Sequence, residues 1–206
     1  MKKLLRKLNT GEFKDNGWLS VQKTIWLDED AVLVVTLNDG VQNNQDTNWK
    51  IEAKSVLEYW ITDAYGDSLN HYENNHVILK QYTDKTANLS FRGTHASSEL
   101  VVGALAEAHF ECVQNWISFN RYMNMEQKLS ELLSGGFGKL ADGPLFLLKE
   151  YERVLARFDI QANITDARPA KRWNGLSWVE LTSPPEMIHL GGTYIVASAF
   201  QATEQT

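Results

Sequence analysis

A short basic and aromatic stretch near the C-terminal third of the chain carries the residue types that concentrate binding energy. Its members are Arg168, Lys171, Arg172, Trp173 and Trp178. Arg and Trp are the residues most enriched at binding hot spots, so together on an exposed loop they would meet an acidic or aromatic partner. In the alternative interpretation, the two tryptophans anchor the loop to the core and the basic residues are solvated. We treat this stretch as the candidate binding site.

A second set of polar side chains lies near the ends of the expected strands. It comprises His71, His76, Arg92 and His95. If all four converged on one cleft, they would form a pocket for a small molecule or substrate. The alternative for His71 and His76 is a solvent-exposed turn, because turn-forming residues surround them.

The sequence Glu107-x-His109-x-Glu111 has residue types that bind metals, but its spacing argues against a metal site. On a helix the two glutamates share a face, whereas His109 points to the opposite side. Helices that bind zinc place two histidines at positions i and i+4 instead. We therefore expect a solvated acidic face, with His109 at the edge of the apolar stripe and no metal bound.

Other catalytic patterns are missing or incomplete. Residues 135–144 (GGFGKLADGP) contain Gly-Lys, but a phosphate-binding loop needs Ser or Thr where Leu140 stands, so a helix–helix connection is predicted. Cys112 lies on the apolar side of a predicted helix, where thiols usually pack inertly. No GxSxG, HExxH, CxxC or GxGxxG pattern occurs. The catalytic residues are therefore unknown, no cofactor is expected, and whether the protein is an enzyme stays open.

Strands are predicted to dominate the first half of the chain. Residues 49–61 alternate between apolar and polar side chains, and residues 31–37 form a continuous β-branched run. The predicted strands are 18–27, 31–37, 49–61, 76–82 and 87–91, followed in the tail by 160–164, 178–181 and 193–200.

Helices are predicted in the middle of the chain. Ser97 and Ser98 suit a helix start, and apolar residues then recur at three- and four-residue steps over about twenty residues. Shorter helices are predicted at 126–133 and 145–158. The expected fold is α+β: one domain over residues 1–206, with a mixed or antiparallel sheet covered by helices. Its β-rich part spans 17–92, its helical part 97–158 and its β-rich tail 160–200.

Charge limits the classes of partner. The 206 residues contain 20 Lys and Arg against 26 Asp and Glu, a net charge of −6. Four of the basic residues (Lys2, Lys3, Arg6 and Lys7) lie in the first eight positions, and the rest carries 16 against 26, or −10. Because nucleic-acid binding needs a surplus of cations, we expect no nucleic-acid partner. An acidic body of this kind attracts basic partners and also keeps a protein soluble.

Compartment and membrane association follow from three further features. The chain has one cysteine, which cannot form an internal disulfide, and its basic N-terminus is not followed by an apolar signal segment. No stretch approaches the length of a membrane-spanning helix. We expect a soluble cytoplasmic protein that does not bind membranes.

Residues 60–138 resemble an uncharacterised group of bacterial proteins. The resemblance is carried by residues 76–82 (HVILKQY), 87–93 (ANLSFRG), 100–115, 116–124 (WISFNRYMN) and 132–138 (LLSGGFG). It implies a bacterial origin and a coherent fold over the middle of the chain, and it transfers no functional residue.

Three functional hypotheses follow, in this order. The first is a non-catalytic binding or protein-interaction module, for example an immunity-type protein whose acidic face neutralises a basic toxin. The second is an enzyme or small-molecule-binding protein with a pocket between sheet and helices. The third is a self-associating subunit of a homo-oligomer.

Overall fold

The chain forms two compact units, each with its own sheet and helices. The computed structural model describes residues 1–9, 17–41, 46–62, 65–173, 176–181 and 183–205. Unit 1 comprises Met1–Leu79 and Thr182–Thr206, and unit 2 comprises Lys80–Leu181. The predicted α+β class is confirmed, although the chain is richer in sheet than expected and its strand pairs are antiparallel. The single domain over 1–206 stays a prediction.

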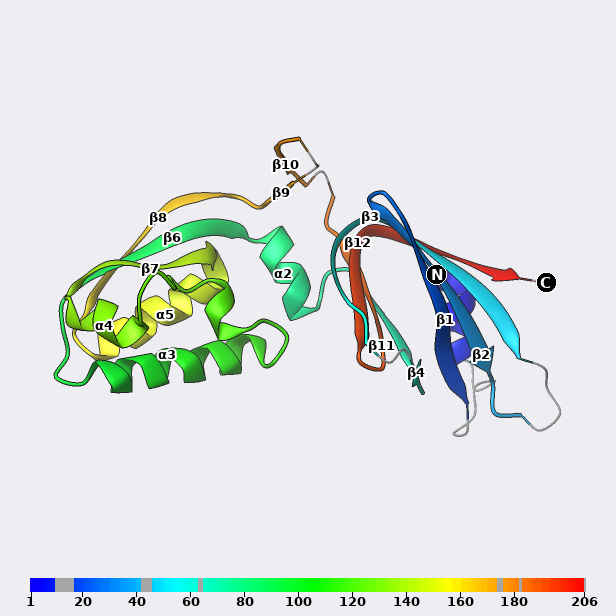
Figure 1. Ribbon diagram of the computed structural model, residues 1–206, viewed down its shortest axis with the longest axis horizontal. Helices are drawn as coiled ribbons and strands as arrows, with labels where there is room; N and C mark the ends of the chain where they lie inside the picture. The colour runs from blue at the N-terminus through cyan, green and yellow to red at the C-terminus, as the bar shows by residue number, and fades with distance from the viewer. Residues whose placement is uncertain (10–16, 42–45, 63–64, 174–175, 182, 206) are drawn as a thin grey trace. The chain divides into compact units, whose positions relative to one another are not determined.

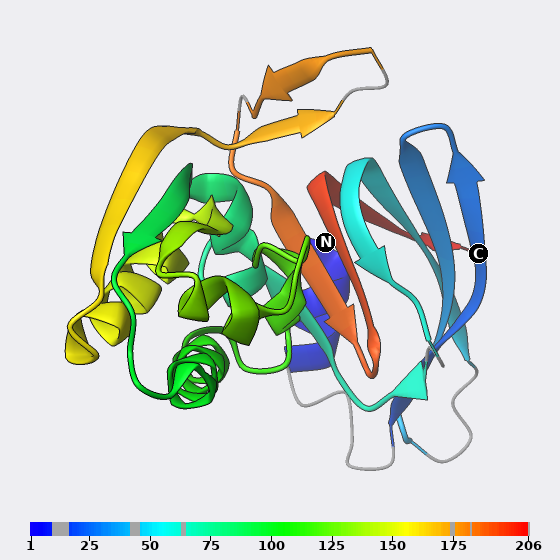
Figure 2. The same cartoon turned by 60° about the vertical axis from the view of Figure 1, so that its left-hand side comes forward.

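Unit 1 is built on a strongly curved seven-stranded sheet (Figures 1 and 2). Its strand order is β4-β1-β2-β3-β12-β11-β5. Bulges after Val21 and between Val196 and Ala197 increase the local twist and bend the strands. The sheet is nearly closed, because Gly66 on the edge strand β4 lies against Gly191 in the turn after β11. The strands are β1 (Trp18–Leu27), β2 (Asp30–Asn38), β3 (Thr47–Trp60), β4 (Tyr65–Gly66), β5 (Leu69–Tyr72), β11 (Glu186–Leu190) and β12 (Thr193–Gln205).

The alternation of apolar and polar residues over 49–61 gives β3 one apolar face, which lies in the core of unit 1. In β3, Trp49, Ile51 and Ala53 are fully buried, while the polar residues between them are partly exposed. These three side chains join a core with residues of β1, β2, β11 and β12. One apolar face per strand is what a sheet with a single buried side requires.

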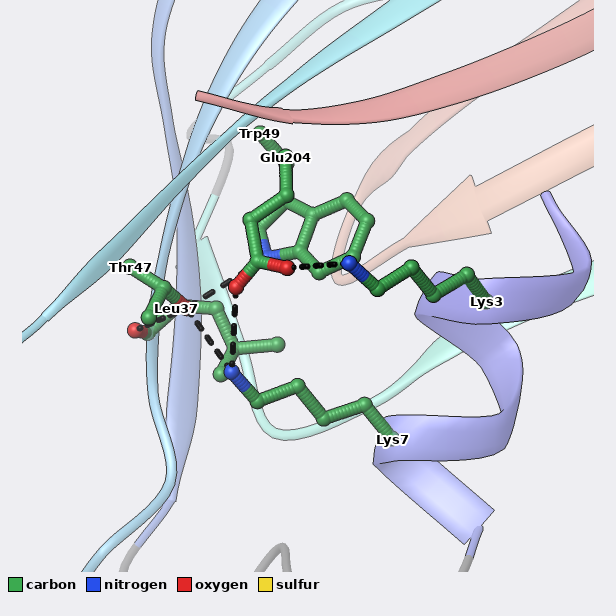
Figure 3. A network of polar contacts seen from close by, with 6 residues as sticks. All are labelled: Lys3, Lys7, Leu37, Thr47, Trp49 and Glu204. Carbon is green, nitrogen blue, oxygen red and sulfur yellow. Dashed lines mark hydrogen bonds and ion pairs between the residues drawn. The ribbon is translucent and has the colours of Figure 1, made fainter. Parts of the chain in front are cut away.

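A short basic helix, α1 (Lys2–Asn9), covers part of this core (Figure 3). Leu4 is fully buried in the sheet's apolar cluster. Lys3 Nζ lies 2.7 Å from Glu204 Oε2 and 5.8 Å from the centre of the Trp49 ring, and Lys7 Nζ lies 3.6 Å from Glu204 Oε1. The N-terminal basic cluster therefore belongs to a docked amphipathic helix, an element that charge counting alone did not predict.

Unit 2 contains a three-stranded antiparallel sheet with helices packed on it. Its strand order is β7-β6-β8, and a separate hairpin follows β8. Helix α5 contacts all three strands, and α3 packs against α5 (Figure 1). The strands are β6 (Lys85–Arg92), β7 (Phe137–Pro144), β8 (Gln161–Pro169), β9 (Lys171–Trp173) and β10 (Trp178–Glu180). The helices are α3 (Ser98–Val113), η1 (Phe119–Arg121), α4 (Leu129–Ser134) and α5 (Leu145–Arg157), and α2 (Val77–Thr83) spans the boundary between the units.

Helix signals in this region are confirmed. Ser97 caps α3, since its hydroxyl accepts a hydrogen bond from the backbone N–H of Leu100 at 3.4 Å. Helix α5 begins directly after Pro144, as predicted. Among the described residues no helix has the length and apolarity needed to cross a membrane.

Two predicted elements were wrong, and the expected loop that carries Arg168, Lys171 and Trp173 instead contains the end of β8 and strand β9. The predicted strand 76–82 is replaced by helix α2 (Val77–Thr83): Ile78 and Gln81 are both buried, three residues apart, and the Tyr122 hydroxyl donates to Gln81 Oε1 at 2.7 Å. Residues 135–144, predicted as a connection, contain β7. Gly136 and Gly138 adopt positive φ angles of 79° and 151°, and this glycine-rich stretch becomes a strand because it pairs with β6.

Gly191→Ala is expected to lower the free energy of unfolding by about 1–3 kcal/mol. Gly191 has a φ of 56°, and an added Cβ would overlap the carbonyl oxygen of Tyr65. The matched control is Gly103→Ala in α3, where the added Cβ meets no atom within 4 Å beyond the adjoining backbone of its own helix. Gly103→Ala should raise the free energy of unfolding by about 0.5–1 kcal/mol, because alanine has a higher helix propensity than glycine. Urea unfolding measures both, and equal effects of the two substitutions would contradict the prediction.

Candidate functional site

The β9–β10 hairpin presents an exposed aromatic pair. Trp173 pairs directly with Trp178 across the two strands, and their rings meet edge to face with centroids 5.8 Å apart. The two side chains are 54% and 64% exposed, and Leu176 at the end of the hairpin is 89% exposed. The tryptophans thus support the hairpin through each other, and the interpretation in which they anchor a loop to the core is wrong.

A pocket of about 440 Å³ lies beside this hairpin. Three of the five predicted binding residues, Arg168, Lys171 and Trp178, line it together. Arg168 is placed by β8, where it pairs with Thr86 of β6, and the other two come from β9 and β10. Arg172 and Trp173 are their neighbours on the hairpin. The remaining lining residues are Thr86, Asp142 and Pro169.

A second pocket, of about 610 Å³, adjoins the first and shares Thr86 and Asp142 with it. One wall of this second pocket is formed by residues 121–126, which lie along β7. The backbone N–H of Asn124 donates to Leu140 O at 2.8 Å, and that of Asp142 donates to Tyr122 O at 2.9 Å. Gly143 makes room for the Tyr122 ring, which would collide with any Cβ there. The pocket is lined by Thr86, Arg121, Tyr122, Met123, Asn124, Met125, Glu126, Lys139, Ala141, Asp142 and Gly143.

We call these two adjoining pockets the groove. Sequence reasoning missed the wall at residues 121–126, because that segment has no periodic pattern and joins β7 only through long-range pairing. The one local signal was Gly143, a small residue in a strand, which marks the close approach of another group. No residue of α3 or α5 lines either pocket, so the groove is not the predicted pocket between sheet and helices.

The charged groups of the groove differ in how they are paired. Lys139 Nζ lies 2.9 Å from Asp142 Oδ2, and the Arg121 guanidinium lies 5.8 Å from the centre of the Tyr122 ring. Arg168 and Lys171 are exposed and make no side-chain hydrogen bond or ion pair with any residue that the structure describes. These two cations therefore keep their hydrogen-bonding capacity for a ligand.

His71 and His76 belong to unit 1 and have different partners. His71 Nε2 lies 2.8 Å from Glu186 Oε2, and its ring meets Phe200 edge to face. His76 packs on Tyr72, with ring centroids 4.7 Å apart. Burial lowers the pKa of His76, and the nearby charge of His189 lowers it further.

Arg92 and His95 belong to unit 2. Arg92 ends β6 and is exposed. His95 Nδ1 lies 3.1 Å from the backbone nitrogen of Ser97, and its ring packs on Phe158, so His95 helps to shape the start of α3. Convergence of these two side chains with His71 and His76 on one cleft stays a prediction.

His109 lies in the core of unit 2, 3% exposed, and not at the edge of the apolar stripe as predicted. Its Nε2 lies 2.7 Å from Ile117 O, a group that only accepts, so Nε2 carries the proton. Its Nδ1, 2.7 Å from the Tyr151 hydroxyl, then accepts from Tyr151. Burial raises the pKa of Tyr151, which keeps this donor protonated. Glu107 and Glu111 are exposed on the other side of the helix, as predicted.

Neither the Cys112 thiol nor the metal-binding residue types form an evident site among the described residues. Burial raises the pKa of the Cys112 thiol, with the charge of Glu150 adding to the effect, so the reactive thiolate is disfavoured. Within the described ranges, no group of three or more His, Cys, Asp or Glu side chains is arranged to hold a metal ion.

Comparisons with protein-family models, curated proteins and solved structures found no match to this chain. The bacterial origin and the cytoplasmic location therefore stay predictions.

Proposed function

We propose that this protein is a non-catalytic protein-interaction module that docks its partner on the β9–β10 hairpin and the adjoining groove. The observation that carries the proposal is the exposed Trp173–Trp178 pair beside a pocket lined by Arg168 and Lys171. Tryptophan and arginine supply most of the binding energy at hot spots when a partner buries them.

The hairpin itself favours a docking role over a purely structural one. It forms a two-stranded sheet of its own, with three residues in each strand. An isolated two-stranded hairpin is marginally stable in water, so burial of both indoles against a partner would stabilise it. Exposed apolar side chains gathered in one place mark interaction sites more often than scattered ones do.

An immunity-type function is the second candidate, and the distribution of charge supports it. Unit 1 has 8 basic and 14 acidic residues, a difference of −6, whereas unit 2 has 12 of each. The whole acidic surplus of the chain thus belongs to unit 1. In this candidate function a basic toxin would contact unit 1, and its association would slow as salt is added.

Site-specific photo-crosslinking in the natural host tests both candidates. A benzoylphenylalanine in place of Leu176 is expected to crosslink one partner protein, whereas the same group in place of Leu100, 61% exposed on α3, should not. Equal crosslinking at both positions, or none at residue 176, would contradict docking on the hairpin. Crosslinking from acidic positions of unit 1 alone would favour the immunity-type function.

Trp178→Ala is expected to weaken binding of that partner about 30-fold, the equivalent of about 2 kcal/mol for loss of one hot-spot side chain. The matched control is Phe110→Ala on α3, because Phe110 is a large aromatic residue that is 54% exposed, close to the 64% of Trp178. Affinity measured by calorimetry with the purified partner should be unchanged in the control. A small molecule that copurifies with the protein, detected as added mass by native mass spectrometry, would instead favour a ligand-binding protein or an enzyme.

A further inference from the structure

The groove has a local charge opposite to that of the whole chain. The chain carries −6, whereas the described residues that line the two pockets include four cations and two carboxylates. The cations are Arg121, Lys139, Arg168 and Lys171, and the carboxylates are Glu126 and Asp142. A ligand of negative charge is therefore favoured at the groove and disfavoured by the chain's net charge elsewhere.

The surplus of positive charge in the groove is concentrated beside the β9–β10 hairpin. Asp142 is already paired with Lys139 at 2.9 Å. Arg168 and Lys171 stand at the junction of β8 and β9, where Pro169 restricts the backbone and the side chain of Ala170 is buried. This anchored junction positions two cations, both without a carboxylate partner among the described residues, on one pocket.

The same pocket offers an apolar surface. The exposed indole of Trp178 and the ring of Pro169 line it next to the two cations. The adjoining pocket adds Met123 and Met125, the latter 55% exposed, and methionine adapts to varied apolar shapes. At about 440 Å³ the first pocket is within the size range that takes one large side chain or a small ligand.

We propose that the groove binds an acidic peptide segment of the partner, in which carboxylates flank one aromatic or large aliphatic side chain. The inference rests on the proposed docking function and adds the chemistry of the partner. The carboxylates pair with Arg168 and Lys171, and the apolar side chain packs on Trp178. A nucleic acid fits less well, because its phosphate array needs many cations, and the described lining of the groove offers four, of which Lys139 is already paired with Asp142.

Peptide selection on the full-length protein tests this proposal. A random dodecapeptide library on phage is selected on the immobilised protein, with the Arg168→Glu/Lys171→Glu variant for counter-selection. Enriched peptides are expected to carry net negative charge and an aromatic or large aliphatic residue. Neutral or basic peptides, or no enrichment over the variant, would overturn the proposal.

Fluorescence polarisation of the best enriched peptide supplies the second readout. Arg168→Glu/Lys171→Glu should weaken its binding about tenfold or more, and added salt should weaken binding to the unmodified protein. Lys2→Glu/Lys149→Glu makes the same change in net charge at exposed positions outside the groove and should leave affinity within about twofold. Equal losses in both double variants would refute a specific acidic site, as would a single-stranded DNA dodecamer that binds with the same dependence on Arg168 and Lys171.

The two proposals fail in different ways. If Trp178→Ala weakens binding of the natural partner and Arg168→Glu/Lys171→Glu does not, docking on the hairpin stands and the acidic segment is wrong. If neither variant affects partner binding, both proposals are wrong.

Discussion

Trp49→Ala is expected to lower the free energy of unfolding of unit 1 by about 3–5 kcal/mol. Trp49 is fully buried in the centre of the curved sheet, where β3 pairs with both β2 and β12. The indole also donates from Nε1 to Thr47 Oγ1 at 3.3 Å and lies under the ammonium group of Lys3. A loss of this size is a large fraction of the total stability of an ordinary domain.

Urea unfolding followed by circular dichroism measures the loss, and hydrogen exchange of β2 and β3 amides locates it. The matched control is Trp26→Ala, because Trp26 is 42% exposed and rests on Tyr59 with ring centroids 4.4 Å apart. Loss of the partly exposed Trp26 ring should lower the free energy of unfolding by about 1 kcal/mol. If the two substitutions cost the same, the buried position assigned to Trp49 is wrong.

His109→Ala should destabilise unit 2 by a similar amount, about 3–5 kcal/mol. The substitution leaves a cavity under α3 and removes the partner of two buried groups, the Tyr151 hydroxyl and the carbonyl of Ile117. Each buried polar group without a partner costs about 1–3 kcal/mol. Urea unfolding measures the effect.

Tyr151→Phe separates the hydrogen bond from the packing. It preserves most of the side-chain volume but leaves His109 Nδ1 without a donor, so we expect a smaller loss of about 1–3 kcal/mol. Glu107→Ala, exposed on the same helix as His109, is the surface control and should stay within about 0.5 kcal/mol. A loss for Tyr151→Phe as large as that for His109→Ala would refute the hydrogen-bonding scheme.

Local patterns were enough for much of the fold. The helical period of apolar residues located α3 and α5, and strict alternation located β3, because each pattern repeats over ten residues or more. The short apolar run at 76–82 was misassigned, since runs of this length suit a strand or a helix equally well. The glycines of 135–144 favoured a loop in the prediction, whereas the structure has strand β7 there, stabilised by its pairing with β6.

Part of the candidate site was also visible from residue types. Residue chemistry predicts a binding site of five residues, and the structure places three of them, Arg168, Lys171 and Trp178, on one pocket. The opposite wall at 121–126 was not predicted. Its position depends on an isolated antiparallel β-bridge between Met123 and Ala141 of β7, which pairs two segments that no local sequence pattern connects.

The sequence by itself determined the class of fold, the helices α3 and α5 and the acidic balance, because these follow from composition and short-range periodicity. Only the tertiary structure decided that the acidic surplus belongs to unit 1, that His109 is a buried hydrogen-bonding residue, and that Trp173 and Trp178 are exposed. The physical reason is that exposure and pairing depend on which distant strands meet. In the centre of the unit 1 sheet, β12 near the C-terminus pairs with β3, so the surroundings of each side chain are set by contacts between residues far apart in the chain.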